Sequence, residues 1–185
     1  MKKVFLRLLM LMMGCFSIHN LHAEGDMKRP VVVIETTKGT FEVTLFPETA
    51  PKTCENFLGL TKNHKYDGVR IHRVIPNFMV QTGDFENQNG TGGKSIWGKE
   101  FPDEISEKVK YDRPGLLGMA NRGPGTNGSQ FFITTVKTPW LDKGHTIFGE
   151  VTKGYEVVKA IEAQGTQQGM PKEEMKILKV YPKPE

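Results

Sequence analysis

Short segments of alternating apolar and polar residues run through most of this chain, a pattern typical of strands rather than long helices. Val31–Thr36 is rich in β-branched residues, and Thr40–Phe46 places its apolar residues on one face. A Lys-Gly pair separates the two segments, which together predict a β-hairpin. The same pattern predicts further strands near Ile71–Ile75, Met79–Thr82, Leu116–Ala120, Gln130–Thr135, Thr146–Val151 and Met175–Tyr181.

Two other segments space their apolar residues as a helix does. The first runs to Lys62, with Thr49 as the expected cap and Pro51 in the first turn. The second is Tyr155–Ala163. The chain shows no internal repeat or linker, so these elements predict a single, mainly β domain. Because closure removes exposed sheet edges, we expect a closed eight-stranded antiparallel barrel capped by two α-helices.

The N-terminus has the three-part layout of a secretory signal peptide: a basic start, an apolar run, and a small-residue end at Ala23. Arg7 interrupts the apolar run, which is also shorter than the roughly 20 residues of a membrane span. The expected organisation is a signal peptide over residues 1–23, a flexible lead-in over 24–30, and the folded domain over 31–185.

A second export signal overlaps the first. The segment Leu11–Cys15 resembles a bacterial lipoprotein processing site, although Met12 stands where Leu is usual, and lipidation of Cys15 would anchor the protein. Cleavage after Ala23 would instead leave Cys54 as the one remaining cysteine, which excludes an internal disulfide. We therefore expect a periplasmic location, with a lipoprotein anchored through Cys15 as the alternative.

Composition agrees with a globular domain, since 37% of the 185 residues are hydrophobic and 25% are charged. The net charge of +4 comes mainly from the N-terminus: cleavage after Ala23 would remove three basic residues and no acid, which leaves +1. The basic balance therefore gives little support for nucleic-acid binding, and we expect none.

The sequence lacks the motifs of several other kinds of functional site. Gly90–Ser95 imitates the end of a phosphate-binding loop, but Gln88 stands where the full motif needs glycine. Ser129 and Cys54 lack the sequence context of activated nucleophiles. The histidines do not have metal-ligand spacing. The sequence thus predicts neither a nucleotide enzyme nor a hydrolase, and no metal or cofactor.

One charged residue interrupts an apolar strand pattern. Arg73 needs either a partner or a function there, and Gln81 and Gln130 on neighbouring strand segments are candidates to orient it. Trp140 follows a proline and is expected to be exposed, which is a binding cue. Taken singly, most apolar residues nearby are equally compatible with a core role, and a lone histidine with a structural one. The candidates for an apolar pocket are Phe78, Met79, Phe132 and Leu141.

At these residues the chain closely resembles the cyclophilin family of peptidyl-prolyl cis-trans isomerases. The resemblance runs from about Val31 to the C-terminus. It is carried by Phe57, Tyr66–Gly68, Ile71–Ile75, Phe78–Asp84, Gly90–Ile96, Met119–Asn121, Asn127–Ile133, and Trp140–Asp142 with His145 and Phe148–Gly149. It implies the family's eight-stranded antiparallel barrel with two helices. It also implies isomerisation of Xaa-Pro bonds in proline-containing polypeptides, by a monomer without a cofactor.

The resemblance also implies roles for individual residues. Arg73 would be the catalytic residue. The proline pocket would consist of Phe78, Met79, Phe132, Leu141 and His145. The groove for the peptide backbone would consist of Gln81, Ala120, Asn121 and Gln130. Trp140 matches the position linked to strong binding of cyclosporin, so a cyclosporin-type inhibitor is expected to bind. The chain departs from the family's usual residues at Asn77, Arg122 and Pro139.

Two functions fit this pattern. The first is an exported isomerase that assists the folding of envelope proteins, and the second is a binding module in which the same groove only holds proline-containing chains. The presence of Arg73 together with the pocket aromatics favours the isomerase.

Overall fold

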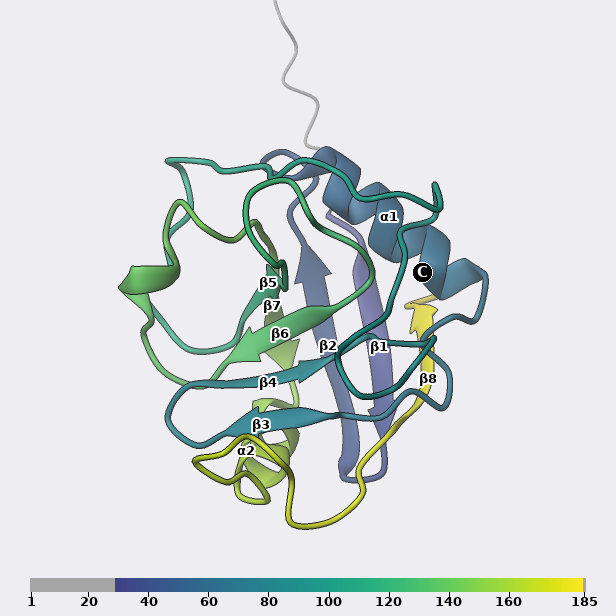
Figure 1. Cartoon of the computed structure of the whole chain (residues 1–185), viewed down its shortest axis with the longest axis vertical. Coiled ribbons are helices and arrows are strands. Elements are labelled where there is room, and N and C mark those ends of the chain that lie inside the picture. The colour runs from purple at the N-terminus through teal and green to yellow at the C-terminus, as the bar shows by residue number, and fades with distance from the viewer. Residues whose placement is uncertain (1–28, 185) are drawn as a thin grey trace, which may run out of the picture.

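The computed structural model describes residues 29–184, and Figure 1 shows a curled sheet with two helices. The predicted signal peptide and most of the predicted lead-in lie outside this range. No helix within it is long and apolar enough to cross a membrane. In chain order the elements are β1 (Val31–Thr36), β2 (Gly39–Leu45), α1 (Pro51–Lys62), β3 (Arg73–Ile75), β4 (Met79–Thr82), β5 (Leu116–Met119), β6 (Phe131–Thr134), the 3-10 helix η1 (Pro139–Leu141), β7 (Ile147–Lys153), α2 (Tyr155–Glu162) and β8 (Ile177–Pro182).

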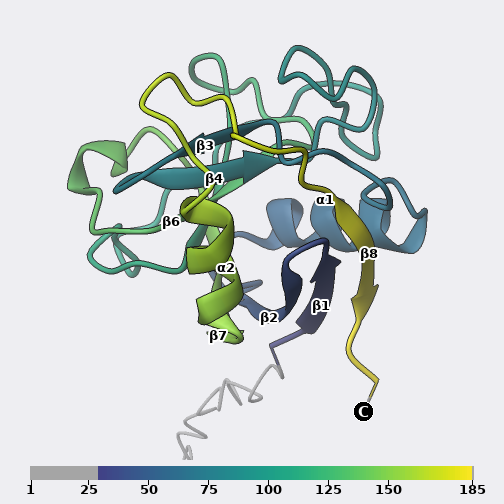
Figure 2. The ribbon, with the colours of Figure 1, turned by 90° about the horizontal axis from the view of Figure 1, so that it is seen from below.

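The eight strands form one antiparallel sheet in the order β3-β4-β6-β5-β7-β2-β1-β8. The prediction of eight antiparallel strands and two helices is confirmed, but the closed barrel is wrong. The sheet is strongly curled and open, with β3 and β8 as its edges (Figure 2).

The sheet stays open because its edge strand β3 is short. β3 has three residues and begins only at Arg73, although the sequence predicted a strand from Ile71. The chain before β3 meets the chain before β8 through an isolated bridge between Arg70 and Lys176 and a hydrogen bond from the Ile71 N–H to the Met175 carbonyl at 2.9 Å. These contacts bring the two edges of the sheet together next to β3 and β8, but β3 and β8 themselves do not pair.

The main core fills the inside of the curl. Its centre is a group of aromatic rings around Phe57 of α1, whose ring lies 5.2 Å from Tyr66, 5.3 Å from Phe131 and 5.4 Å from Phe148. Each such pair adds about 0.5–1.5 kcal/mol beyond the burial of its area. α1 therefore packs firmly near one end of the sheet, while α2 lies near the other (Figure 1).

The N-terminus of α1 is capped by a residue that is distant in the sequence. The predicted cap Thr49 is wrong: Ala50 occupies the cap position without a side-chain hydrogen bond, and the Thr49 hydroxyl donates to the Phe46 carbonyl. The Glu104 carboxylate instead accepts the Lys52 N–H at 3.0 Å and the Thr53 N–H at 2.8 Å. A carboxylate is favourable there because it meets unpaired N–H groups and the positive end of the helix dipole.

Candidate active site

The candidate residues lie on the face of the sheet that points away from the main core. Because directly paired residues of antiparallel strands point to the same face, the register places side chains in rows across the sheet. One row joins Arg73 of β3, Gln81 of β4, Phe132 of β6 and Gly118 of β5. Phe132 belongs to a second, smaller apolar cluster with Met79.

Hydrogen bonds connect the polar members of this row to each other and to Gln130, which precedes β6. The Arg73 Nη1–H donates to Gln81 Oε1 at 3.0 Å, and Gln81 Nε2 donates to Gln130 Oε1 at 3.0 Å. Gln130 Nε2 in turn donates to the carbonyls of Gly90, at 2.9 Å, and Gly92, at 2.8 Å. The guanidinium is thus held at a defined place although Arg73 itself is exposed.

A cavity of about 180 Å³ opens beside Arg73. Its apolar floor is the buried ring of Phe132, which stacks on Tyr111 with centroids 5.9 Å apart and meets the His145 ring edge-on at 5.5 Å. The cavity brings together Arg73, Phe78, Met79, Gln81, Ala120, Asn121, Phe132, Leu141 and His145, nine of the predicted site residues. It offers an apolar ring a close-fitting place next to a cationic donor.

Gly118 is the residue that lets Phe132 lie flat across this row. A Cβ on Gly118 would overlap the Phe132 ring and the Tyr111 hydroxyl. A glycine is therefore required by close approach, since no side chain fits between the strand and the ring.

The side of the cavity opposite Arg73 is held by a separate set of hydrogen bonds. His145 Nδ1 donates to the Met119 carbonyl at 2.9 Å, which fixes its tautomer because a carbonyl only accepts. The Asn121 side-chain amide donates to the Gly144 carbonyl at 2.8 Å. Within the described residues no group accepts the backbone N–H of Asn121, so this donor is available to a ligand.

Two predicted residues lie outside the small cavity. Gln130 lines its larger neighbour, as described next. Trp140, in η1, is 64% exposed, as expected from its sequence context, and its ring centroid lies 6.0 Å from that of Phe78. It therefore stands at the rim.

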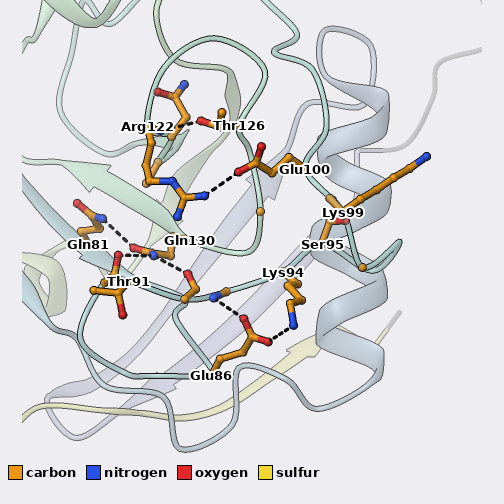
Figure 3. A pocket seen from close by; sticks show the side chains of 17 residues that line it. Gln81, Glu86, Thr91, Lys94, Ser95, Lys99, Glu100, Arg122, Thr126 and Gln130 are labelled. Atoms are coloured by element: carbon orange, nitrogen blue, oxygen red, sulfur yellow. Dashed lines mark hydrogen bonds and ion pairs between the residues drawn. The ribbon is translucent and has the colours of Figure 1, made fainter.

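A larger, polar cavity of about 380 Å³ adjoins the first and shares Gln81, Ala120 and Asn121 with it. The glycine-rich segment Gly90–Ser95 forms one wall, and Arg122 bonded to Glu100 at 2.7 Å forms another (Figure 3). Glu100, a lining residue, was not predicted from the sequence. Arg122 was visible only as a departure from the family's usual residue.

The described residues contain no cluster of three or more His, Cys, Asp or Glu side chains suited to a metal ion. Cys54 is buried, and burial raises the pKa of its thiol to about 12, so it is not a thiolate at neutral pH. Ser129 is also buried, and its hydroxyl donates to the Gly83 carbonyl at 2.5 Å. Both side chains thus have structural contacts rather than the setting of a nucleophile.

Comparison with known proteins identifies the family. The family model for "Cyclophilin type peptidyl-prolyl cis-trans isomerase/CLD" matches residues 31–181. The chain is 53% identical over 150 residues to peptidyl-prolyl cis-trans isomerase CYP71 of Arabidopsis thaliana, covering 80% of this chain but 24% of that protein. It is 50% identical over 149 residues to peptidyl-prolyl cis-trans isomerase-like 1 of Aspergillus fumigatus, covering 80% of this chain and 92% of that protein.

Solved structures agree with this result. A crystal structure of a cyclophilin-type peptidyl-prolyl cis-trans isomerase from Cryptosporidium parvum matches with a TM-score of 0.81 and 37% identity, over 85% of this chain and 99% of that one. A structure of the same protein in the presence of the dipeptide Ala-Pro matches with a TM-score of 0.80. The chain belongs to the cyclophilin-type peptidyl-prolyl cis-trans isomerase family. The predicted family and enzyme class are confirmed.

Proposed function

We propose that the cavity beside Arg73 catalyses rotation about Xaa-Pro peptide bonds, and that Arg73 is its catalytic residue. The observation that carries this proposal is the position of the guanidinium, at the rim of an apolar cavity and held there by Gln81 at 3.0 Å. The cavity suits a proline ring, and a ring bound there would bring its prolyl nitrogen near the guanidinium.

The mechanism follows from the physics of the amide. Rotation about the C–N bond costs about 18–20 kcal/mol because resonance is lost. In the twisted state the prolyl nitrogen recovers a localised lone pair, which accepts a hydrogen bond, whereas the planar amide nitrogen does not. A donor aimed at that nitrogen therefore binds the twisted state better than either planar state, which lowers the barrier. Arginine suits this role because it stays charged and its donors lie in one plane.

The other site residues would hold the substrate while the preceding carbonyl rotates. The rings of Phe78 and Phe132 with Met79, Leu141 and His145 would enclose the proline ring. The Asn121 N–H would hold the peptide backbone on the far side. The structure of the related Cryptosporidium protein with Ala-Pro supports a proline-containing ligand. No bond is made or broken, which agrees with the buried, structural settings of Ser129 and Cys54.

The direct test is Arg73→Ala, assayed on an Ala-Pro peptide. We expect kcat/KM to fall by about 10²–10³, as for loss of one donor that acts in the transition state. Arg70→Ala is the matched control, since Arg70 is an exposed arginine three residues away with a 3.8 Å contact to Glu174. Near-full activity of Arg73→Ala would reject the catalytic role of Arg73, whereas a wild type that binds the peptide without turnover would leave a peptide-binding module.

We also propose that the enzyme is bacterial, that it assists the folding of exported proteins in the periplasm, and that it works as a monomer. The support for export is the N-terminal sequence, with its basic start, apolar run and Ala23. The intact mass of the N-terminus, measured on soluble and membrane fractions of the full chain, distinguishes cleavage after Ala23 from lipidation at Cys15. A mass that retains Met1 in the cytoplasmic fraction would reject export.

Binding of a cyclosporin-type inhibitor is a further part of this proposal. The exposed Trp140 ring next to Phe78 extends the apolar rim of the cavity, which supports contact with a ligand larger than proline. Trp140→Ala should therefore weaken inhibition by cyclosporin more than it lowers kcat/KM for a short peptide. Equal effects on both would reject a specific role for Trp140.

A further inference from the structure

The orientation of Arg73 depends on two side-chain amides whose direction is not set by their shape. Gln130 Nε2 uses both hydrogens, one on the Gly90 carbonyl and one on the Gly92 carbonyl. The reversed amide would place its oxygen against two carbonyl oxygens, so Gln130 Oε1 must face Gln81. Figure 3 shows this arrangement from Gln81 through Gln130 to the glycine-rich segment.

The direction of Gln130 decides that of Gln81. Since Gln130 presents an acceptor, Gln81 must present Nε2 to it and Oε1 to Arg73. The two loop carbonyls therefore determine the polarity of a series of hydrogen bonds that ends on the guanidinium. We call this series, from the Gly90 and Gly92 carbonyls through Gln130 and Gln81 to Arg73, the amide relay.

The loop that supplies the two carbonyls is held by one carboxylate. Asp84, just beyond β4, is completely buried. Its Oδ1 and Oδ2 together accept five backbone N–H groups at 2.9–3.2 Å, from Glu86, Asn87, Asn89, Gly90 and Gly92. Two of these five donors are the N–H groups of Gly90 and Gly92, the same residues whose carbonyls accept from Gln130. Gly90 has a φ of +94°, a conformation that needs glycine and orients its peptide groups.

We propose that Asp84 is a positioning residue for the isomerase reaction, which acts on Arg73 through the loop carbonyls and the amide relay. Asp84 lines neither of the two cavities. Its effect is to hold the Gly90 and Gly92 carbonyls where both hydrogens of Gln130 Nε2 reach them. This inference rests on the proposed catalytic role of Arg73.

The test is a double-mutant cycle between Asp84→Asn and Gln130→Ala, with kcat/KM and thermal stability measured on the folded proteins. Asparagine has the same shape but offers one acceptor oxygen in place of two. Asp84→Asn should lower kcat/KM by about ten- to a hundredfold, as for a small displacement of a reacting group. In the Gln130→Ala background it should lower kcat/KM no further, although it still lowers the melting temperature, because the relay is already broken.

Glu104→Gln is the matched control, since Glu104 also accepts two backbone N–H groups and orders a distant segment, the start of α1. It should lower stability and leave kcat/KM unchanged. The proposal fails if Asp84→Asn keeps full kcat/KM, if its effect multiplies with that of Gln130→Ala, or if Glu104→Gln loses as much activity. Failure of the proposed function is distinct, since it would appear as activity retained by Arg73→Ala.

A second variant serves if Asp84→Asn does not fold. Asn89 is exposed, and its Oδ1 accepts the N–H of Thr91 at 3.0 Å and the Thr91 hydroxyl at 2.7 Å. Thr91 lies between Gly90 and Gly92, whose carbonyls accept from Gln130. Asn89→Ala should lower kcat/KM by about threefold, as for one weakened neutral hydrogen bond. The effect should again vanish in the Gln130→Ala background. An unchanged kcat/KM, or an effect that persists there, would overturn the proposal.

Discussion

Phe131 and Phe132 are neighbours on β6 and have opposite surroundings. Phe131 points into the main core, with its ring 5.3 Å from Phe57, whereas Phe132 points to the other face and forms the floor of the small cavity. Both are nearly fully buried, at 1% and 4% exposure. Burial alone therefore does not separate a core aromatic from a site aromatic; the face of the strand does, because successive side chains of a strand point to opposite faces.

The largest expected effect comes from exchanging these two rings for alanine. Phe131→Ala should lower the free energy of unfolding by about 3–5 kcal/mol, since it leaves a cavity among packed aromatic rings. Phe132→Ala should lose less stability but lower kcat/KM by about a hundredfold, because the proposed proline pocket loses its floor. Urea unfolding and peptide assays on both variants check this. Equal losses of stability with equal activity would remove the distinction.

The next-largest expected effect concerns Gly118, which leaves room for the Phe132 ring. Gly118→Ala should lower the free energy of unfolding by about 1–3 kcal/mol through overpacking and displace Phe132. Its kcat/KM should fall with the stability. Gly144→Ala is a suitable control, because a Cβ there would lie 3.7 Å from the Leu141 carbonyl oxygen, an ordinary contact. A stable and fully active Gly118→Ala would show that the ring has room to move.

Acid should weaken the site loop through Asp84. Burial alone would raise the pKa of this carboxyl, but the backbone N–H groups of Asn87, Gly92 and Gly90 outweigh burial and lower the pKa to about 2. Because the folded-state pKa lies below the unfolded value near 3.9, Asp84 stabilises the fold at neutral pH by about 2 kcal/mol. That contribution is present above about pH 4 and is lost as the pH falls towards 2.

The measurement compares urea unfolding of wild type and Asp84→Asn across this range. The wild type should lose its advantage over the variant between about pH 4 and pH 2. Other groups also titrate in this range, so the difference between the two proteins, rather than either curve alone, reports on Asp84. That difference includes the effect of the Asp84 charge on its neighbours, since it pushes the pKa of His72 and of Glu86 upward. A difference that stays constant with pH would contradict the lowered pKa.

The smallest effect concerns the polar cavity. The Arg122–Glu100 pair is exposed, at 71% and 49% of the two side chains, and such pairs contribute about 0–1 kcal/mol. Arg122→Ala should therefore leave stability nearly unchanged and alter KM by about two- to threefold, in a way that depends on the residues that flank the Xaa-Pro pair. A panel of peptides that differ at those residues would measure this. Uniform KM values across the panel would mean that the polar cavity does not contact the peptide.

Much of this fold could be predicted from local pattern. Alternation located every strand to within a few residues, because a strand of an open sheet records its two faces in sequence. The closure of the sheet could not be predicted, since it depends on whether the short segment at Arg73 reaches β8. The capping of α1 by Glu104 was also invisible, because it joins residues about fifty positions apart.

The candidate site, like the fold, could be predicted only in part. Resemblance identified the residues that line the small cavity, and the structure brings nine of them together. It could not identify the dependence of Gln130 on the Gly90 and Gly92 carbonyls, or that of the loop on Asp84. Those links consist of backbone groups, which every residue type has, so the sequence carries no direct sign of them.

The sheet order has a consequence for the timing of folding. β1 pairs with β8 along most of its length, from Val32 opposite Pro182 to Thr36 opposite Ile177. β8 is the last of the described strands to be synthesised, so one side of β1 has no native partner until the chain has been made as far as β8. The native sheet can therefore form only after β8 has left the ribosome. Until then the unpaired side of β1 exposes backbone N–H and C=O groups, which can pair with the strands of other chains.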